Sequence, residues 1–247
     1  MFVAARGMVH RSLRSLCDLL LPPRCLLCEM PAVSSSFCSD CLAGFRPLPV
    51  HCPRCALPFA ESATIPHLCG DCLSDPPAYD WTEAAGLYEG SLRHAIHLFK
   101  FEGRIDLDRP LARQLLSAWE QTSSSFHPDR LVPVPLHPKR LRQRGCNQAL
   151  LLAHELGRSL KVPVATRLLR RTQETPAQQG LSAENRHQNL KRAFALEEKV
   201  RCGERLVLID DVMTTGATAQ ECARLLRRGG AAEVGVMVLG RARRHLI

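Results

Sequence analysis

The 247-residue sequence lacks an apolar run long enough to cross a membrane, which takes about 18 residues. Its best candidate, residues 16–21, contains Asp18 and is followed by Pro22 and Pro23. This absence excludes an integral membrane protein. The basic N-terminus also lacks the apolar block and cleavage site of a secretory signal. We therefore expect a helix over residues 1–24 and a reducing, cytoplasmic location.

Aromatic residues are scarce as well, at 5% of the chain, and only Phe194 lies beyond residue 127. In contrast, residues 139–201 contain 14 Lys or Arg residues against five Glu and no Asp. This basic block favours an anion-binding surface, and a solvated basic face is the alternative. Stacking of nucleic-acid bases needs aromatic rings. Binding of DNA would therefore be mainly electrostatic and salt-dependent. Candidate rings for stacking lie ahead of the block, between residues 79 and 101: Tyr79, Trp81, Tyr88, Phe99 and Phe101.

Cysteine is abundant, and eight of the 12 cysteines form four Cys-x-x-Cys pairs separated by 9, 10 and 13 residues. Two such pairs bring four thiolates to about 2.3 Å from one zinc ion. A disulfide framework is the alternative in an oxidising compartment. The strict spacing and the reducing location favour two zinc sites. The predicted ligands are Cys25, Cys28, Cys38, Cys41, Cys52, Cys55, Cys69 and Cys72.

The order of the pairs favours two sequential ribbons, because each loop then stays short. The four cysteines from Cys25 to Cys41 would bind the first ion, and the four from Cys52 to Cys72 the second. Cross-braced pairing, in which the pairs interleave along the chain, is the alternative. Because four thiolates leave no position for water, both sites should be structural. Eight thiolates with two Zn²⁺ ions reduce the formal charge of +9 to about +5. We expect a double zinc ribbon over residues 25–75.

The rest of the chain, residues 78–247, alternates strand and helix patterns. Short apolar runs at 131–134 and 164–169 flank a helical period over 149–160. Residues 205–209 and 234–240 are strand-like and enclose a helix over 219–228. Such alternation predicts an α/β domain with a mostly parallel sheet covered by helices.

The segment after the strand at 205–209 carries the groups that bind a phosphorylated sugar. Asp210 and Asp211 are followed by threonines and a glycine at the start of the next helix. Ligands bind beyond the carboxyl ends of strands in such sheets, and a helix N-terminus favours a phosphate. Two adjacent carboxylates suit the hydroxyl groups of a ribose. The pattern predicts a ribose 5-phosphate site, with a simple helix cap as the alternative.

These stretches resemble one known family. Residues 207–218 (VLIDDVMTTGAT) resemble the phosphoribosyl pyrophosphate (PRPP) motif of type I phosphoribosyltransferases. With the cysteine pairs and the stretches DLLLPPRCLLC, VPVPLHPKRLRQRGCNQA and TQETPAQQGLSAENRHQN, the chain is similar to the ComF family. The resemblance spans nearly the whole chain. It implies a type I phosphoribosyltransferase-like parallel sheet with helices on both faces, preceded by a small zinc-ribbon domain.

The resemblance also implies roles for individual residues. Asp210 and Asp211 would hold the ribose hydroxyls, and with Lys139 and Arg144 they are the candidate catalytic residues. The residues expected around the 5-phosphate are Thr214, Thr215, Gly216, Ala217 and Thr218. The remaining residues of the expected pyrophosphate loop are Arg140, Arg142 and Gly145. Residues 170–190 correspond to a loop that closes over the site. Cys146 departs from the family, which has an aromatic residue there, and Lys100 is a further candidate near the pocket.

Three functions stay open at this point. The chain could transfer phosphoribosyl groups, sense PRPP or a nucleotide without turnover, or bind single-stranded DNA. The first two need PRPP or another ribose 5-phosphate ligand with Mg²⁺, which would stabilise the pyrophosphate leaving group. The third follows from the resemblance, which implies a role in natural competence or DNA utilisation and other DNA-uptake proteins as partners. Salt-tolerant PRPP binding would separate the first two from the third.

Overall fold

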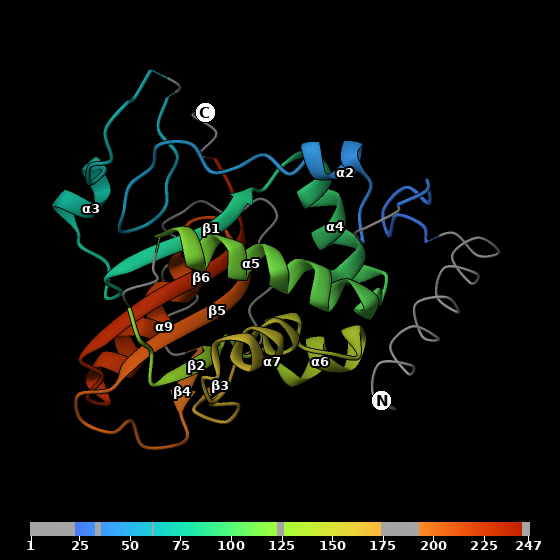
Figure 1. Ribbon diagram of the computed structural model, residues 1–247. Coiled ribbons are helices and arrows are strands. Elements are labelled where there is room, and N and C mark those ends of the chain that lie inside the picture. The colour runs from blue at the N-terminus through green and yellow to red at the C-terminus, as the bar shows by residue number, and fades with distance from the viewer. Residues whose placement is uncertain (1–22, 33–35, 61, 123–125, 174–192, 244–247) are drawn as a thin grey trace, which may run out of the picture. The chain divides into compact units, whose positions relative to one another are not determined.

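The computed structural model describes residues 23–32, 36–60, 62–122, 126–173 and 193–243 (Figure 1). The chain divides into two compact units, residues 1–45 and 46–247. The first unit contains the short helix α2 (Ser39–Ala43). The helix predicted over residues 1–24, and most of the closing loop predicted over 170–190, lie outside the described residues.

The second unit is built on a four-stranded parallel sheet with the strand order β1-β6-β5-β2. A separate antiparallel pair, β3 with β4, lies beside it in the same unit. The strands are β1 (Trp81–Leu87), β2 (Arg130–Pro133), β3 (Leu169–Arg171), β4 (Phe194–Leu196), β5 (Arg205–Met213) and β6 (Glu233–Arg241). The predicted α/β class is confirmed.

Helices cover both faces of this sheet: α5 and α7 lie over one face and α9 over the other (Figure 1). Successive side chains of β5 point to opposite faces, so Leu206 and Leu208 pack with Cys222 of α9, while Val207 faces the other layer. The helices of this unit are α3 (Gly70–Ser74), α4 (Gly90–Phe101), η1 (Ile105–Leu107), α5 (Asp108–Thr122), α6 (Pro138–Arg144), α7 (Gln148–Leu160) and α9 (Ala217–Arg228). Within the described residues, none has the length and hydropathy that a membrane span requires.

The second cysteine tetrad groups with the sheet rather than with the first tetrad, since the boundary between the units falls at residue 45. The sequence predicts one ribbon domain over residues 25–75, and this boundary stays a prediction. Two hydrogen bonds explain the grouping: Thr82 Oγ1 donates to the carbonyl of Arg54 at 2.8 Å, and Arg241 Nε donates to the carbonyl of Cys55 at 2.9 Å. The turn between Cys52 and Cys55 is thereby held by β1 and β6.

Several elements differ from the sequence-based expectation, among them two in the middle of the chain. The basic stretch 137–145, expected as a loop, is mostly the helix α6. Pro138 stands at its first turn, the ring of His137 accepts from the N–H of Lys139, and Gly145 ends it with φ +76°. The strand expected over 164–169 is also displaced, because Val164 forms only an isolated bridge with Leu131 and β3 begins at residue 169.

One close contact links the edge strand β1 to its neighbour β6. A Cβ atom on Gly235 would lie 2.1 Å from a ring carbon of Trp81, so glycine is the residue that lets this indole lie against β6. The indole N–H also donates to Glu233 at 3.3 Å, and the ring meets the edge of Phe126. The aromatic contact therefore depends on the missing side chain at position 235.

We predict that Gly235→Ala destabilises the protein by about 1–3 kcal/mol, because the added methyl group forces Trp81 out of its place. Urea unfolding followed by tryptophan fluorescence measures this change. Gly70→Ala is the control, since a Cβ there meets no atom within 4 Å and should leave stability nearly unchanged. Equal stability of wild type and Gly235→Ala would contradict the packing described here.

Candidate functional site

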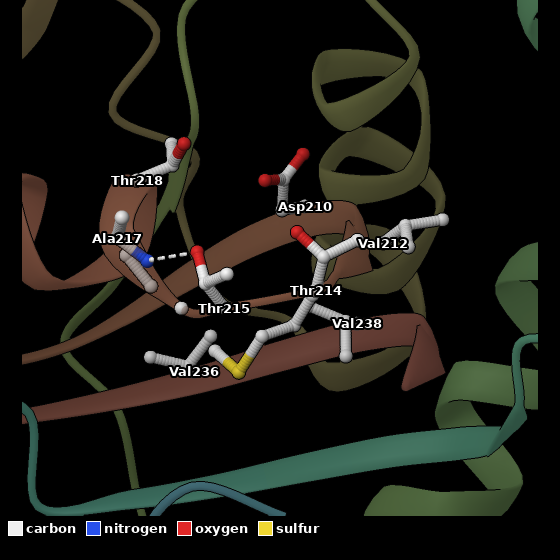
Figure 2. A pocket seen from close by; sticks show the side chains of 11 residues that line it. Asp210, Val212, Thr214, Thr215, Ala217, Thr218, Val236 and Val238 are labelled. Atoms are coloured by element: carbon white, nitrogen blue, oxygen red, sulfur yellow. Dashed lines mark hydrogen bonds between the residues drawn. The ribbon is translucent and has the colours of Figure 1, made fainter. Parts of the chain in front are cut away.

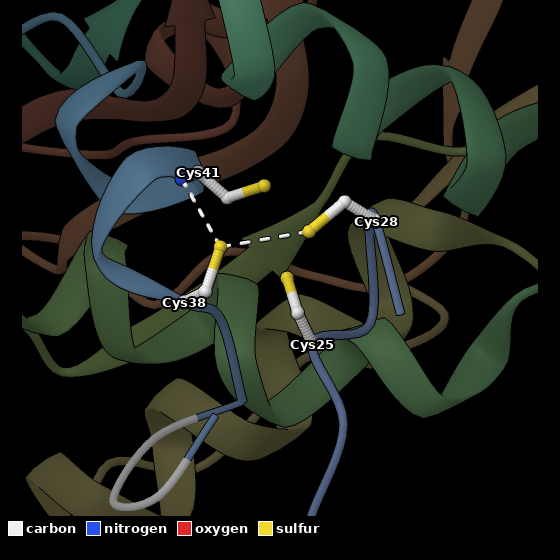
Figure 3. Close-up of side chains that lie close together, drawn as sticks. All are labelled: Cys25, Cys28, Cys38 and Cys41. Atoms are coloured by element: carbon white, nitrogen blue, oxygen red, sulfur yellow. Dashed lines mark hydrogen bonds between the residues drawn. The ribbon is translucent and has the colours of Figure 1, made fainter. Parts of the chain in front are cut away.

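The eight cysteines of the four pairs form two tetrads, in the sequential grouping that the sequence favours. In each tetrad the four sulfur atoms lie within 4.8 Å of one another. Figure 3 shows Cys25, Cys28, Cys38 and Cys41 converging, with 3.5 Å between the sulfurs of Cys28 and Cys38. In the second tetrad, the sulfurs of Cys55 and Cys69 are 3.7 Å apart. A tetrahedral Zn–S₄ shell needs sulfurs about 3.8 Å apart. Both tetrads fit a zinc ion.

Backbone N–H groups favour the thiolate of one cysteine in each tetrad, whereas burial raises the pKa of Cys41 and of Cys72. Burial raises the pKa of Cys25, but the N–H groups of Cys38 and Leu27 outweigh it, and the pKa is lowered to about 6. Burial also raises the pKa of Cys52, while the N–H of Cys69 and neighbouring N–H groups lower it to about 7. These donors favour the deprotonated ligand, as the knuckle of a zinc ribbon requires.

A pocket opens where β5 ends and α9 begins. Figure 2 shows Asp210 and the threonines of the turn arranged around it, with Thr215 Oγ1 accepting from the N–H of Ala217 at 3.4 Å. Gly216 precedes the helix with φ +80°, a conformation that favours glycine. The first N–H groups of a helix have no carbonyl partner within it, so they are donors for an anion. The predicted residues that line this pocket are Asp210, Thr214, Thr215, Gly216, Ala217 and Thr218.

The two adjacent aspartates have different surroundings. Asp210 lines the pocket after β5, whereas Asp211 is 7% exposed and its Oδ1 lies 2.7 Å from Nζ of Lys100 on α4. Neighbouring residues of a strand point to opposite faces, and α4 and α9 lie on different sides of β5, which explains the separation. Lys100 thus belongs to the carboxylate cluster, as the sequence suggests. Both acids were predicted to contact the ligand, and in this arrangement Asp210 is the one directed at the pocket.

The Asp210 carboxyl carries a shifted pKa. Burial raises it to about 7 and the charge of Asp211 adds to the rise, while Lys100 and Arg171 act in the opposite direction. Arg171, at the end of β3, is only 7% exposed, and burial lowers the pKa of its guanidinium group. Sequence reasoning missed Arg171, because the run RLLRR does not show which arginine turns inward. A buried cation beside Asp210 adds an anion-attracting group to this site.

The basic residues predicted for the pyrophosphate loop separate into two sets on α6. Arg140 and Arg144, four residues apart and so on one side of the helix, both act electrostatically on Arg171. Lys139 and Arg142 instead line a surface hollow together with His137. Residues three or four apart lie on the same side of a helix, which explains why the four basic residues form two sets. A loop has no such periodicity. Gly145 ends α6 and precedes Cys146, which is partly buried.

One aromatic residue named by the sequence is exposed beside this basic helix. Phe101 has 60% of its surface exposed, and the guanidinium of Arg144 lies 5.0 Å from the centre of its ring. The ring of His97 lies 4.9 Å away on the same helix. Tyr79 and Phe99, in contrast, are buried in the core. Of the aromatic candidates for stacking, Phe101 is therefore the most accessible.

Two segments of the chain match known domain families. Residues 16–73 match the double zinc ribbon domain, and residues 147–245 match the phosphoribosyl transferase domain. The first match spans both cysteine tetrads, and the second contains β5, the pocket and α9. The chain is thus a protein that joins a double zinc ribbon to a phosphoribosyltransferase domain.

Relatives match over nearly the whole chain. DNA utilization protein YhgH of Escherichia coli K12 is 40% identical over 229 residues, which cover 90% of this chain and 99% of that protein. Competence protein F of Haemophilus influenzae is 36% identical, covering 89% of this chain and 97% of that protein. Competence protein ComFC of Bacillus subtilis is 29% identical, covering 96% and 98%. The chain belongs to the ComF family.

We predict two zinc ions per chain, measured by elemental analysis of protein purified without added metal. Cys41→Ser and Cys72→Ser should each reduce the content to one, because three thiolates hold zinc far less tightly than four. Cys72→Ser should also lower the melting temperature of the sheet-bearing unit. Cys202→Ser, an exposed thiol outside both tetrads, is the control and should retain two ions. A metal-free chain with disulfides within the tetrads would contradict the assignment.

Proposed function

We propose that this protein binds PRPP, or another ligand with a ribose 5-phosphate group, together with Mg²⁺ in the pocket after β5. The observation that carries the proposal is the turn at residues 214–218, which opens α9 directly beside the carboxylate of Asp210. The match of residues 147–245 to the phosphoribosyl transferase domain supports the same ligand class.

The 5-phosphate would bind at the turn between β5 and α9. The helix α9 is 12 residues long, and its aligned peptide groups favour negative charge at the N-terminus. Thr214 and Thr215 are exposed there and can add hydroxyl donors to the backbone N–H groups. Gly216 adopts the positive φ that this turn needs before the first N–H groups of α9. This arrangement supplies the donors that a phosphate needs without requiring a lysine in the turn.

The ribose hydroxyls would donate to the carboxylate of Asp210, which lines the same pocket. Asp211, held by Lys100, would act indirectly by maintaining the charge balance around its neighbour. Mg²⁺ prefers oxygen ligands and usually keeps several waters while binding substrate phosphates. The pocket suits such an ion, since the carboxylate of Asp210 is next to the expected place of the ligand. When bound, the ion would neutralise charge on the pyrophosphate.

The pyrophosphate of PRPP would be bound by the cations on the other side of the ribose. Cleavage of the bond between the anomeric carbon and pyrophosphate develops negative charge on the leaving group. Arg140 and Arg144 of α6 would stabilise that charge together with the buried Arg171, on which both act electrostatically. Lys139 and Arg142 would instead attract the ligand from solvent. Assay of pyrophosphate release with a panel of nucleobases separates a transferase from a sensor that binds without turnover.

Single-stranded DNA is a second candidate ligand, favoured by the exposed pair Phe101 and Arg144 and by the names of the relatives. A base could stack on the Phe101 ring while the arginines bind phosphates. Calorimetric titration with single-stranded DNA and with Mg-PRPP, each at low and high salt, distinguishes the two ligands, since only DNA binding should weaken steeply with salt. The family also supports a place in the reducing cytoplasm, among other proteins of DNA uptake.

We predict that Asp210→Asn weakens Mg-PRPP binding by at least about tenfold, because the ribose hydroxyls lose a charged acceptor. Isothermal titration calorimetry measures the dissociation constant. Asp129→Asn is the matched control at the opposite end of β5, where the carboxylate accepts from the N–H of Arg205. This control should bind as tightly as wild type, and all three proteins should retain two zinc ions. Unchanged affinity in Asp210→Asn would remove Asp210 from the site.

We also predict that Asp210→Asn makes the protein more stable at pH 8. The pKa of Asp210 is raised from 3.8 to about 7, so the folded state binds a proton more tightly than the unfolded chain. Ionisation of this carboxyl therefore costs stability progressively as the pH rises from about 4 to about 7. Asparagine avoids that cost, and the gain should be at least about 1 kcal/mol at pH 8.

Urea unfolding of both proteins at a series of pH values measures this difference, which should shrink as the pH falls. Asp106→Asn is a control of opposite sign, because a hydrogen bond from Arg104 lowers the pKa of Asp106. That substitution should slightly destabilise the protein above about pH 4. If wild type is more stable than Asp210→Asn at pH 8, the prediction is wrong, because ionisation of Asp210 then does not lower the free energy of unfolding.

A further inference from the structure

A buried arginine connects the second cysteine tetrad to the turn at residues 214–218. Arg241, the last residue of β6, is 3% exposed. Its Nε donates to the carbonyl of Cys55 at 2.9 Å, and its Nη1 donates to the carbonyl of Met213 at 3.1 Å and to that of Thr214. One rigid guanidinium group therefore bridges the knuckle of a metal ribbon and the first residue of the turn at 214–218.

The knuckle itself is fixed to the sheet at a second point. Thr82 of β1, which is fully buried, donates from Oγ1 to the carbonyl of Arg54 at 2.8 Å and from its N–H to the carbonyl of Pro53 at 3.4 Å. The loop between Cys52 and Cys55 is thus held by both β1 and β6. A change in the shape of this loop would be transmitted to Arg241 rather than absorbed by solvent.

The second tetrad and the turn at 214–218 also face each other across a cavity. A cavity of about 240 Å³ lies between the tetrad and the turn, lined by Cys55 and Cys72 on one side and by Thr215 and Gly216 on the other. Tyr79 also lines it, and a Cβ at position 216 would lie 3.0 Å from the Tyr79 hydroxyl. The space behind the turn is therefore hollow, and Arg241 supplies the contact that crosses it.

We propose that Arg241 is a positioning residue that transmits the fold of the second zinc ribbon to the turn at 214–218 and keeps this turn in its anion-binding shape. The inference rests on the proposed function of the turn. By holding the carbonyls of Met213 and Thr214, the guanidinium leaves the N–H groups that open α9 directed at the pocket. When bound, zinc would fix the knuckle that carries the carbonyl of Cys55.

The chemistry of the side chain explains why arginine is needed. A buried cation costs free energy unless its donors are satisfied, and here carbonyl oxygens from separate segments accept from it. The planar, five-donor fork of arginine can reach these acceptors at once, whereas the three donors of a lysine are all on one nitrogen. The positive charge behind the turn also favours a phosphate in front of it.

The test compares Arg241→Ala with wild type by two measurements: the dissociation constant for Mg-PRPP, and amide hydrogen exchange at residues 213–218 without ligand. We expect at least about tenfold weaker binding and faster exchange in the turn, with two zinc ions retained. Guanidinium ion at millimolar concentration should partly restore both properties, because the substitution opens onto the cavity. Methylammonium, a cation without the fork, should restore neither. Wild-type binding and exchange in Arg241→Ala would overturn the proposal.

Two pairs of variants separate positioning from general stability. Arg130→Ala removes another partly buried guanidinium, paired with Glu204 at the opposite end of the sheet. It should lower the melting temperature and leave the turn and the affinity unchanged. Cys72→Ser should accelerate exchange at 213–218, and Cys41→Ser in the first tetrad should not. Equal exchange in these two cysteine variants would also overturn the proposal.

The two measurements distinguish this inference from the proposed function. If wild type does not bind Mg-PRPP, the proposed function fails, and hydrogen exchange alone decides whether Arg241 orders the turn. If Arg241→Ala does not fold, Arg241→Lys takes its place, since it keeps the charge and loses the fork. Faster exchange in a folded Arg241→Lys protein supports the inference, and wild-type exchange overturns it.

Discussion

The backbone of the turn between β5 and α9 has to meet two requirements at once. For the proposed binding of an anion its N–H groups must stay available, while its carbonyls need hydrogen-bond partners of their own. Arg241 satisfies the carbonyls of Met213 and Thr214 from behind, and it takes its own support from the carbonyl of Cys55. The pocket, the end of β6 and the second metal ribbon are therefore parts of one hydrogen-bonded arrangement. These hydrogen bonds explain why the second ribbon lies in the same compact unit as the sheet.

Charge around the pocket is balanced rather than uniformly positive. Lys100 neutralises Asp211 at 2.7 Å, and Arg171 lowers the pKa of Asp210 against the effect of burial. A carboxyl whose pKa is about 7 can change its protonation state near neutral pH when a cation or hydroxyl donors approach, whereas a surface carboxylate is already ionised there. Ionisation of Asp210 therefore lowers the stability of the free protein, and a bound ligand would offset this loss. Such local compromise is typical of functional sites.

The sequence predicts what depends on local patterns and misses what depends on tertiary packing. The cysteine spacing predicted both tetrads, and the run from Val207 to Thr218 predicted the strand, turn and helix of the pocket. The strand β1 was missed, because its inward positions include Thr82 and Ala84, which give a weak apolar alternation. Arg241 was missed because nothing in a sequence indicates that a terminal strand residue reaches the carbonyls of two distant segments. The different directions of Asp210 and Asp211 likewise follow only from the layers on each side of β5.

The central claim is that the turn opening α9 binds the 5-phosphate while Asp210 binds the ribose. A crystal structure of the protein with Mg²⁺ and PRPP tests it most directly. The account predicts density for the 5-phosphate within hydrogen-bonding distance of the N–H groups of residues 215–218, with ribose hydroxyls at Asp210. A ligand bound elsewhere, with this turn in contact only with solvent, would contradict the account.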